Sequence, residues 1–323
     1  MSHVPKRRLT KNLFNYGLLF TTTTLIGSAI WVRWKTRCTE NRYSPQGNFV
    51  YVDDLKLHYL EEGEGIPVIL IHGNYAQASD FEASGLITLL AQKHRVIAFD
   101  RPGYGFSSRC HARTWTPTSQ AELISRAVSS LGIKKAIVIG HGQGATVAAA
   151  MAINHPQMVD SMMLLSGYFY PTRRTNIVSS TLLNLPIIGS VLKNTIMPLI
   201  GQVRFSYTKK RAFSPRAISY RYDALVPYDL QVRPETIASS IQDSCLASFN
   251  IESLSHMYQQ ISQPVTIVTG DSDQINNPKK HSYKLHQQIL QSQLKIVPCA
   301  GHMVHYVFAR KICAWADDLN KMN

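Results

Sequence analysis

Several histidine and aspartate residues of this sequence directly follow short β-rich runs, where their side chains could take part in proton transfer. Asp271 and Asp273 follow one such run, and Gly301-His302 follows another. A third run leads into the glycine-rich segment Gly140-His141-Gly142-Gln143-Gly144. Imidazole and carboxylate groups are common general acids and bases in enzymes, so these turns are the candidates for chemistry.

The candidate residues need a sheet that brings the ends of distant runs together. Short β-rich runs alternate with helical patterns, at residues 49–53, 56–61, 68–72, 95–100, 136–140, 161–166, 265–270 and 294–298. Such alternation predicts a mostly parallel sheet with helices on both faces. The third and fifth runs are apolar throughout, as is typical of strands buried on both sides, whereas the first two alternate and predict an antiparallel hairpin at the sheet edge. Open sheets of this kind bind ligands at the carboxyl ends of their strands.

The long interval between Ser166 and Val265 breaks this alternation. It holds helical apolar patterns at 177–192, 196–203 and 237–246 and no strand signal. A structureless loop of this length is uncommon in a compact domain. We therefore expect a helical cap at 168–263, of the kind that shapes access of a substrate, inserted into an α/β core made of residues 41–167 and 264–323.

In these motifs the chain resembles the α/β-hydrolase family over residues 48–320. The resemblance rests on the turn His72-Gly73, the loop Asp100-Arg101-Pro102-Gly103-Tyr104-Gly105-Phe106-Ser107, the outer glycines of the 140–144 segment, and an acidic residue that precedes the final histidine. It implies the α/β-hydrolase fold, with a mostly parallel central sheet, flanking helices and an inserted helical cap. The chain looks most similar to serine hydrolases of the AB hydrolase-1 type.

The resemblance also implies roles for residues that match the family's motifs. His302 matches the general base, and Asp273 matches the acid that orients its imidazole, with Asp271 a less well placed alternative. The backbone N–H groups of Asn74 and Gln143 match the donors that stabilise an oxyanion. The implied activity is hydrolysis of a small carboxylic ester or a related acyl substrate.

The chain departs from the family at the position of the nucleophile. The family's nucleophile elbow has the pattern G-x-S-x-G, with Asp or Cys replacing Ser in some branches. Here Gly140 and Gly144 keep the outer glycines, but Gly142 occupies the centre. Glycine has no side-chain atom that can attack a carbonyl carbon, so covalent catalysis cannot start at this residue.

Three hypotheses account for Gly142. The chain is a catalytically impaired hydrolase, or a pseudoenzyme, that still binds a small ester-like or apolar ligand. Alternatively, the His302/Asp273 dyad activates water without a covalent intermediate, or an otherwise ordinary serine hydrolase carries a Ser-to-Gly change. Ser166 and Cys299 are weak candidates for a replacement nucleophile, because neither sits on an elbow.

The N-terminal residues 1–40 are basic and hold an uncharged stretch at 12–32 with basic residues on both sides. This length fits a single membrane-spanning helix, although Asn15 and four threonines at 21–24 dilute its apolar character. We expect an uncleaved membrane anchor, with the globular part weakly favoured on the non-cytoplasmic side. The alternative is a signal peptide that is cleaved near Gly27-Ser28-Ala29, which would release a secreted protein.

Composition and charge exclude several other classes of protein. The composition is ordinary for a globular chain, with 45% hydrophobic and 17% charged residues, which argues against disorder. The five cysteines have no zinc spacing and do not form a disulfide framework, so we expect no metal. Half of the net charge of +14 lies in the first 37 residues and no nucleic-acid-binding motif is present, so we expect no nucleic-acid partner. The glycine-rich segment lacks the spacing of a dinucleotide or phosphate loop, so we expect no cofactor.

Overall fold

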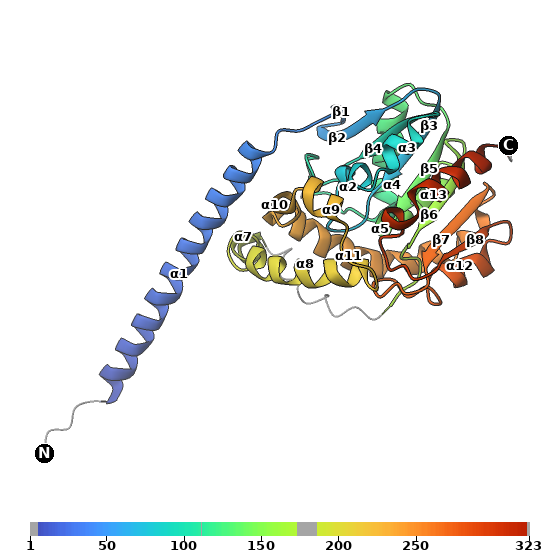
Figure 1. The fold of residues 1–323 in the computed structure, drawn as a ribbon. Helices are drawn as coiled ribbons and strands as arrows, with labels where there is room; N and C mark the ends of the chain where they lie inside the picture. The colour runs from blue at the N-terminus through green and yellow to red at the C-terminus, as the bar shows by residue number, and fades with distance from the viewer. Residues whose placement is uncertain (1–5, 111, 173–185, 322–323) are drawn as a thin grey trace, which may run out of the picture.

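The structure, a computed structural model, describes residues 6–110, 112–172 and 186–321 and has an α/β architecture (Figure 1). Within these residues, eight strands form one sheet in the order β1-β2-β4-β3-β5-β6-β7-β8. The strands are β1 (Asn48–Val52), β2 (Leu55–Glu62), β3 (Ile66–Ile71), β4 (His94–Phe99), β5 (Ala136–His141), β6 (Val159–Leu165), β7 (Val265–Gly270) and β8 (Gln293–Val297). All eight lie within two residues of the runs expected from the sequence. The fold expected from the sequence is confirmed.

The sheet is antiparallel at one edge and parallel elsewhere. β1 and β2 pair antiparallel, as the alternating pattern of the first two runs predicts, and β2 also pairs antiparallel with β4. From β4 through β3, β5, β6 and β7 to β8, every neighbouring pair is parallel. The carboxyl ends of β5, β6 and β7 therefore meet at one edge, where the candidate residues follow them.

Helices cover both faces of the sheet because its central strands are apolar on both sides. Ile69 and Ile71 pack on one face with α4 (Pro117–Ser130), α5 (Gln143–Asn154) and α12 (Ser282–Gln288). Val68 and Leu70 pack on the opposite face with α2 (Ala78–Ala83), α3 (Leu86–Leu90) and α13 (Val304–Lys321). Alternate residues of one strand thus enter two different cores, which fixes the register of the sheet around the candidate site.

Between β6 and β7 the described chain is helical. We call this segment the cap; it comprises α7 (Pro186–Asn194), α8 (Met197–Phe213), α9 (Tyr220–Leu225), α10 (Tyr228–Gln231), α11 (Pro234–Ser255) and the 3₁₀ turn η1 (Tyr258–Gln260). In Figure 1, α8 and α11 lie side by side beneath the sheet in the view shown. The first part of the helix expected at 177–192 lies outside the described residues.

A buried ion cluster joins the cap to the core. Asp243 of α11 accepts hydrogen bonds from Arg101 (3.0 Å) and Arg109 (2.9 Å), and the side chains of all three are at most 2% exposed. The Tyr104 hydroxyl lies 3.1 Å from the same carboxylate. Arg101 also donates to the side-chain oxygen of Asn74 at 2.7 Å. One cap residue therefore holds the loop after β4 and the turn after β3 in a single network.

The expectation of a membrane-spanning anchor is wrong. Residues 12–32 lie within one long helix, α1 (Lys6–Arg42), and no helix in the described part of the chain is long and apolar enough to cross a membrane. The length of this stretch and the basic residues on both sides are typical of a membrane span. Asn15 and the threonines at 21–24, however, lower its mean hydropathy. Instead, α1 contacts the cap, where Ser28 donates to the carbonyl of Thr195 at 3.0 Å and Val32 is buried. The structure therefore does not support the membrane as a partner of this segment.

Candidate active site

Gly142 occupies a sharp turn between β5 and α5. Its φ is 56° and its ψ is −115°, a conformation that L-amino acids with a side chain adopt only under strain. The neighbouring Gly144 leaves no room for a side chain, because a Cβ atom there would collide with the carbonyl oxygens of Ile71 and His72. The strand-turn-helix geometry of a nucleophile elbow is thus present around a residue that carries no side chain.

Asp273 and His302 lie together at the carboxyl edge of the sheet. Nδ1 of His302 lies 2.9 Å from Oδ2 of Asp273, and the Asp273 carboxylate is fully buried. The other oxygen, Oδ1, accepts the backbone N–H groups of Ile275 (2.7 Å) and Asn276 (2.9 Å). These bonds hold the carboxylate in place, so the His302 ring is oriented with Nε2 free of the carboxylate.

Nε2 of His302 faces Gly142. A Cβ atom built on Gly142 would lie 3.2 Å from Nε2 and 3.6 Å from Cα of Gly73. A hydroxyl on that Cβ would therefore come within hydrogen-bonding reach of Nε2. The structure brings Asp273 and His302 next to the elbow, although 131 and 160 residues separate them from Gly142 along the chain.

The other acid considered from the sequence, Asp271, lies elsewhere. Its carboxylate is exposed and accepts the Ser272 hydroxyl at 2.7 Å and the backbone N–H of Cys299 at 3.1 Å. These hydrogen bonds hold the pKa of Asp271 below its ordinary value. Asp271 therefore supports the turn before His302 rather than the ring of His302.

Asn74 and Gln143 both lie beside Gly142, since Gln143 follows it directly and Asn74 follows Gly73, which a Cβ atom on Gly142 would contact. Gln143 is the first residue of α5, and Asn74 follows the turn His72-Gly73 after β3. The Asn74 side chain is held between core and cap, because its amide donates to the Ser244 hydroxyl at 2.9 Å and its oxygen accepts from Arg101. Both residues line the cavity described next, so the backbone positions matched to an oxyanion site border the same space as His302.

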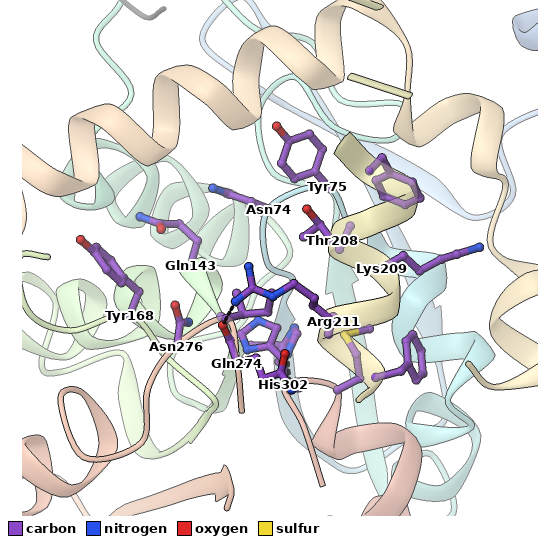
Figure 2. A pocket seen from close by; sticks show the side chains of 18 of the residues that line it. Asn74, Tyr75, Gln143, Tyr168, Thr208, Lys209, Arg211, Gln274, Asn276 and His302 are labelled. Carbon is purple, nitrogen blue, oxygen red and sulfur yellow. Dashed lines mark hydrogen bonds between the residues drawn. The ribbon is translucent and has the colours of Figure 1, made fainter. Parts of the chain in front are cut away.

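A cavity of about 350 Å³ lies over this site, between the core and the cap (Figure 2). Gly142, Gln143, Asn74 and His302 form its core side, and α8 forms much of its cap side. The volume suits a small organic ligand. From the cap, the described lining includes Phe205, Thr208, Lys209, Arg211, Phe213 and Tyr222, together with Arg204. Sequence reasoning missed these residues, for which the basic run Lys209-Lys210-Arg211 is a signal in the sequence.

His141 and His305 lie in the core beneath His302. The His141 ring lies 4.6 Å from the ring of His302 and 4.5 Å from that of His305. Burial, strengthened by the two neighbouring imidazoles, lowers the pKa of His141 far below its ordinary value, so its ring is neutral. Its Nε2 atom lies 3.1 Å from the backbone oxygen of His302 and supports that loop.

Asp80, His141 and His305 form one group whose ligand atoms lie within 4.8 Å of one another, the spacing that a metal ion could use. Existing contacts account for this arrangement. His305 Nε2 lies 3.1 Å from Asp80 Oδ2, and the Tyr306 hydroxyl donates to the other oxygen of Asp80 at 2.8 Å.

Neither replacement nucleophile reaches the cavity. Ser166 is buried at the end of β6 and Cys299 is exposed before His302, and both have a positive φ. Neither is among the described residues that line the cavity.

Comparison with known proteins supports the fold. The sequence matches the family described as alpha/beta hydrolase fold over residues 66–183 and 230–309, more than half of the chain. It is 32% identical over 117 residues to 2-hydroxy-6-oxononadienedioate/2-hydroxy-6-oxononatrienedioate hydrolase 2 of Pseudomonas putida, covering 35% of this chain and 41% of the relative. Haloalkane dehalogenase 2 of Mycobacterium bovis is 28% identical over 116 residues, covering 36% of this chain and 40% of the relative.

These alignments span less than half of each relative's length. Among solved structures, a meta-cleavage product hydrolase superposes with a TM-score of 0.67 at 21% identity, covering 86% of this chain and 98% of that one. At this identity the likeness supports the fold alone. Together with the matched segments, it shows that this chain belongs to the alpha/beta hydrolase fold family.

Proposed function

We propose that this protein is an ester-hydrolase-type α/β hydrolase that retains the acid–base dyad and the oxyanion site but lacks the covalent nucleophile. It binds a small ester-like ligand in the cavity over Gly142 and turns it over slowly or not at all. One observation carries the proposal: the elbow conformation at Gly142 is intact and Nε2 of His302 points at it, yet no side-chain atom stands between them.

The remaining groups fit two parts of acyl transfer, the proton transfer that accompanies attack on the carbonyl carbon and the stabilisation of the oxyanion that the attack creates. The Asp273 carboxylate would keep the proton of His302 on Nδ1, so that Nε2 is the basic nitrogen. The backbone N–H groups of Gln143 and Asn74 would stabilise a developing oxyanion, and they do not depend on a hydroxyl at residue 142. Loss of the nucleophile from such a triad costs about 10⁶ in turnover, while binding and the oxyanion site retain a small part of the catalysis.

The proposal is tested by comparing the chain as it stands with its Gly142→Ser variant on a panel of short- and medium-chain activated esters. We expect the variant to hydrolyse esters at a rate well above that of the natural chain. A Gly142→Ser, His302→Gln double variant is the matched control and should lose the gain. If the single variant folds and binds esters but does not hydrolyse them, the proposal is wrong.

A second candidate function rests on the intact dyad. The His302/Asp273 pair would activate a water molecule beside Gly142, with no covalent intermediate. In that case the natural chain has measurable esterase activity that His302→Ala abolishes. Gly142→Ala would also abolish it, because the added methyl group would lie 3.2 Å from Nε2, in the space that the water needs. Activity that survives His302→Ala would rule this candidate out.

A further inference from the structure

The described lining of the cavity over Gly142 holds several positive charges and no carboxylate. Arg204, Lys209 and Arg211, all from α8, border it, and none of the described residues that line it is an aspartate or a glutamate. A cavity with one sign of charge and walls of low dielectric concentrates ligands of the opposite sign. Its cap side therefore favours an anionic ligand.

Arg211 is better placed than Lys209 to bind such a ligand. Lys209 is engaged with Asp223 at 2.9 Å, and Figure 2 shows its side chain pointing away from His302. Arg211 instead extends toward Gln274 beside His302 and donates one N–H to the Gln274 backbone oxygen at 2.6 Å. Among the residues that the structure describes, no carboxylate lies within ion-pair distance of Arg211.

The backbone fixes Arg211 relative to the dyad. The carbonyl of Ala212, the next residue, accepts the backbone N–H of His302 at 2.8 Å and that of Met303 at 3.2 Å. The end of α8 is thus hydrogen-bonded to the loop that carries the general base. A group held by Arg211 would be held at a set position relative to His302 and Gly142.

We propose that the ligand of this cavity is a small ester that carries a carboxylate, and that Arg211 is the residue that selects the carboxylate. The ester part of this inference rests on the function proposed above. Arginine presents several N–H donors in a planar fork that matches a carboxylate, and only one donor of Arg211 is used by Gln274. The ester carbonyl would then lie toward Gln143 and His302.

Binding to the natural chain tests the inference without any turnover. The probes are monomethyl succinate, glutarate and adipate, each paired with its neutral dimethyl ester, and affinities are measured by calorimetry at pH 7.5. We expect at least one monoanionic ester to bind about tenfold or more tightly than its neutral partner, as for a charge-assisted hydrogen bond. Arg211→Met should remove this preference and Arg211→Lys should keep part of it. Lys210→Met is the matched control, because Lys210 is exposed, carries the same charge and does not line the cavity.

Equal affinity for the paired esters, a preference that survives Arg211→Met, or no binding of any probe overturns the inference. Hydrolysis of a neutral ester by the Gly142→Ser variant tests the proposed function independently of the anion preference. Hydrolysis without an anion preference overturns the inference alone. An anion preference that depends on Arg211, in a chain whose Gly142→Ser variant hydrolyses neither ester, supports the inference and contradicts the proposed function.

Discussion

Nε2 of His302 lies 3.2 Å from the point where a Cβ atom would stand on Gly142. The dyad is therefore aimed at a residue that has nothing to deprotonate. Because Asp273 and the Ala212 carbonyl hold His302 from two sides, this arrangement is fixed by both core and cap. On the proposed function, residue 142 alone separates this chain from an active ester hydrolase.

The elbow conformation predicts a stability cost for any side chain at residue 142. Gly142→Ser and Gly142→Ala should each lower the free energy of unfolding by about 1–2 kcal/mol, because φ is positive there and the new Cβ crowds His302. Urea denaturation followed by circular dichroism measures the change. Equal losses in both variants point to the backbone as the cause, whereas an unchanged midpoint would mean that the elbow is not strained.

The different contacts of Asp273 and Asp271 predict that their substitutions change the kcat of an active Gly142→Ser chain to unequal extents. In the Gly142→Ser chain, Asp273→Asn should lower kcat by about 10⁴, because an amide no longer holds His302 in the required tautomer. Asp271→Asn should leave kcat unchanged, since Asp271 contacts Ser272 and Cys299. Steady-state kinetics on one activated ester measures both. A larger loss of kcat in Asp271→Asn than in Asp273→Asn would mean that Asp271, not Asp273, orients His302.

The ion cluster around Asp243 predicts a large loss of stability when its charge is removed. Asp243→Asn leaves the buried guanidinium groups of Arg101 and Arg109 without a counter-charge and should lower the free energy of unfolding by about 3–5 kcal/mol. Asp229→Asn is the control, because Asp229 is partly exposed and lies 3.6–3.8 Å from Lys35 and Arg42; its loss should be below about 1 kcal/mol. Similar losses in a chemical denaturation series would contradict the assigned role of Asp243.

His72 predicts a loss of stability in acid. Its Nδ1 lies 2.7 Å from the Gly73 oxygen and its Nε2 accepts the backbone N–H of Arg101 at 2.9 Å, so the ring is neutral. Burial, with the Arg101 charge adding to it, lowers the pKa of His72 to about 4. As the pH falls from about 6.5 to 4, the unfolded chain binds a proton that the folded chain does not, so His72 costs about 3 kcal/mol of stability by pH 4.

The His72→Gln variant isolates this contribution, because glutamine can accept the Arg101 N–H without titrating. Unfolding free energies at pH 7, 5.5 and 4.5 should fall less steeply for the variant than for the natural chain, whatever its stability at pH 7. Parallel pH profiles for the two chains would show that His72 does not titrate as stated.

The strands and the core-side residues of the site could be read from the sequence because their signals are local. Apolar runs bounded by turns mark β3 and β5, and the turns that follow them carry Asn74 and Gln143. The preference for Asp273 over Asp271 came from the family pattern, and the hydrogen bonds of the two carboxylates agree with it.

The cap side of the site could not be predicted in the same way. Arg211 borders the cavity because the end of α8 is hydrogen-bonded to the loop of His302, and that placement depends on contacts between residues far apart in the chain, such as Ala212 with His302. The role of Asp243 likewise has no local signal in the sequence, because it depends on ion pairs with the distant residues Arg101 and Arg109. For α1, the length and flanking charges of residues 12–32 predict a membrane span, but Asn15 and the threonines at 21–24 make this stretch less apolar. No helix in the described part of the chain is long and apolar enough to cross a membrane.

The most direct test of the account is covalent labelling of residue 142 by a fluorophosphonate, located by mass spectrometry of the intact chain and of its peptides. The Gly142→Ser chain should form one adduct per molecule on residue 142, the natural chain should form none, and adding His302→Gln should slow the labelling strongly. An adduct on the natural chain, or a folded Gly142→Ser chain that resists the probe, would contradict the claim that residue 142 is the single missing part.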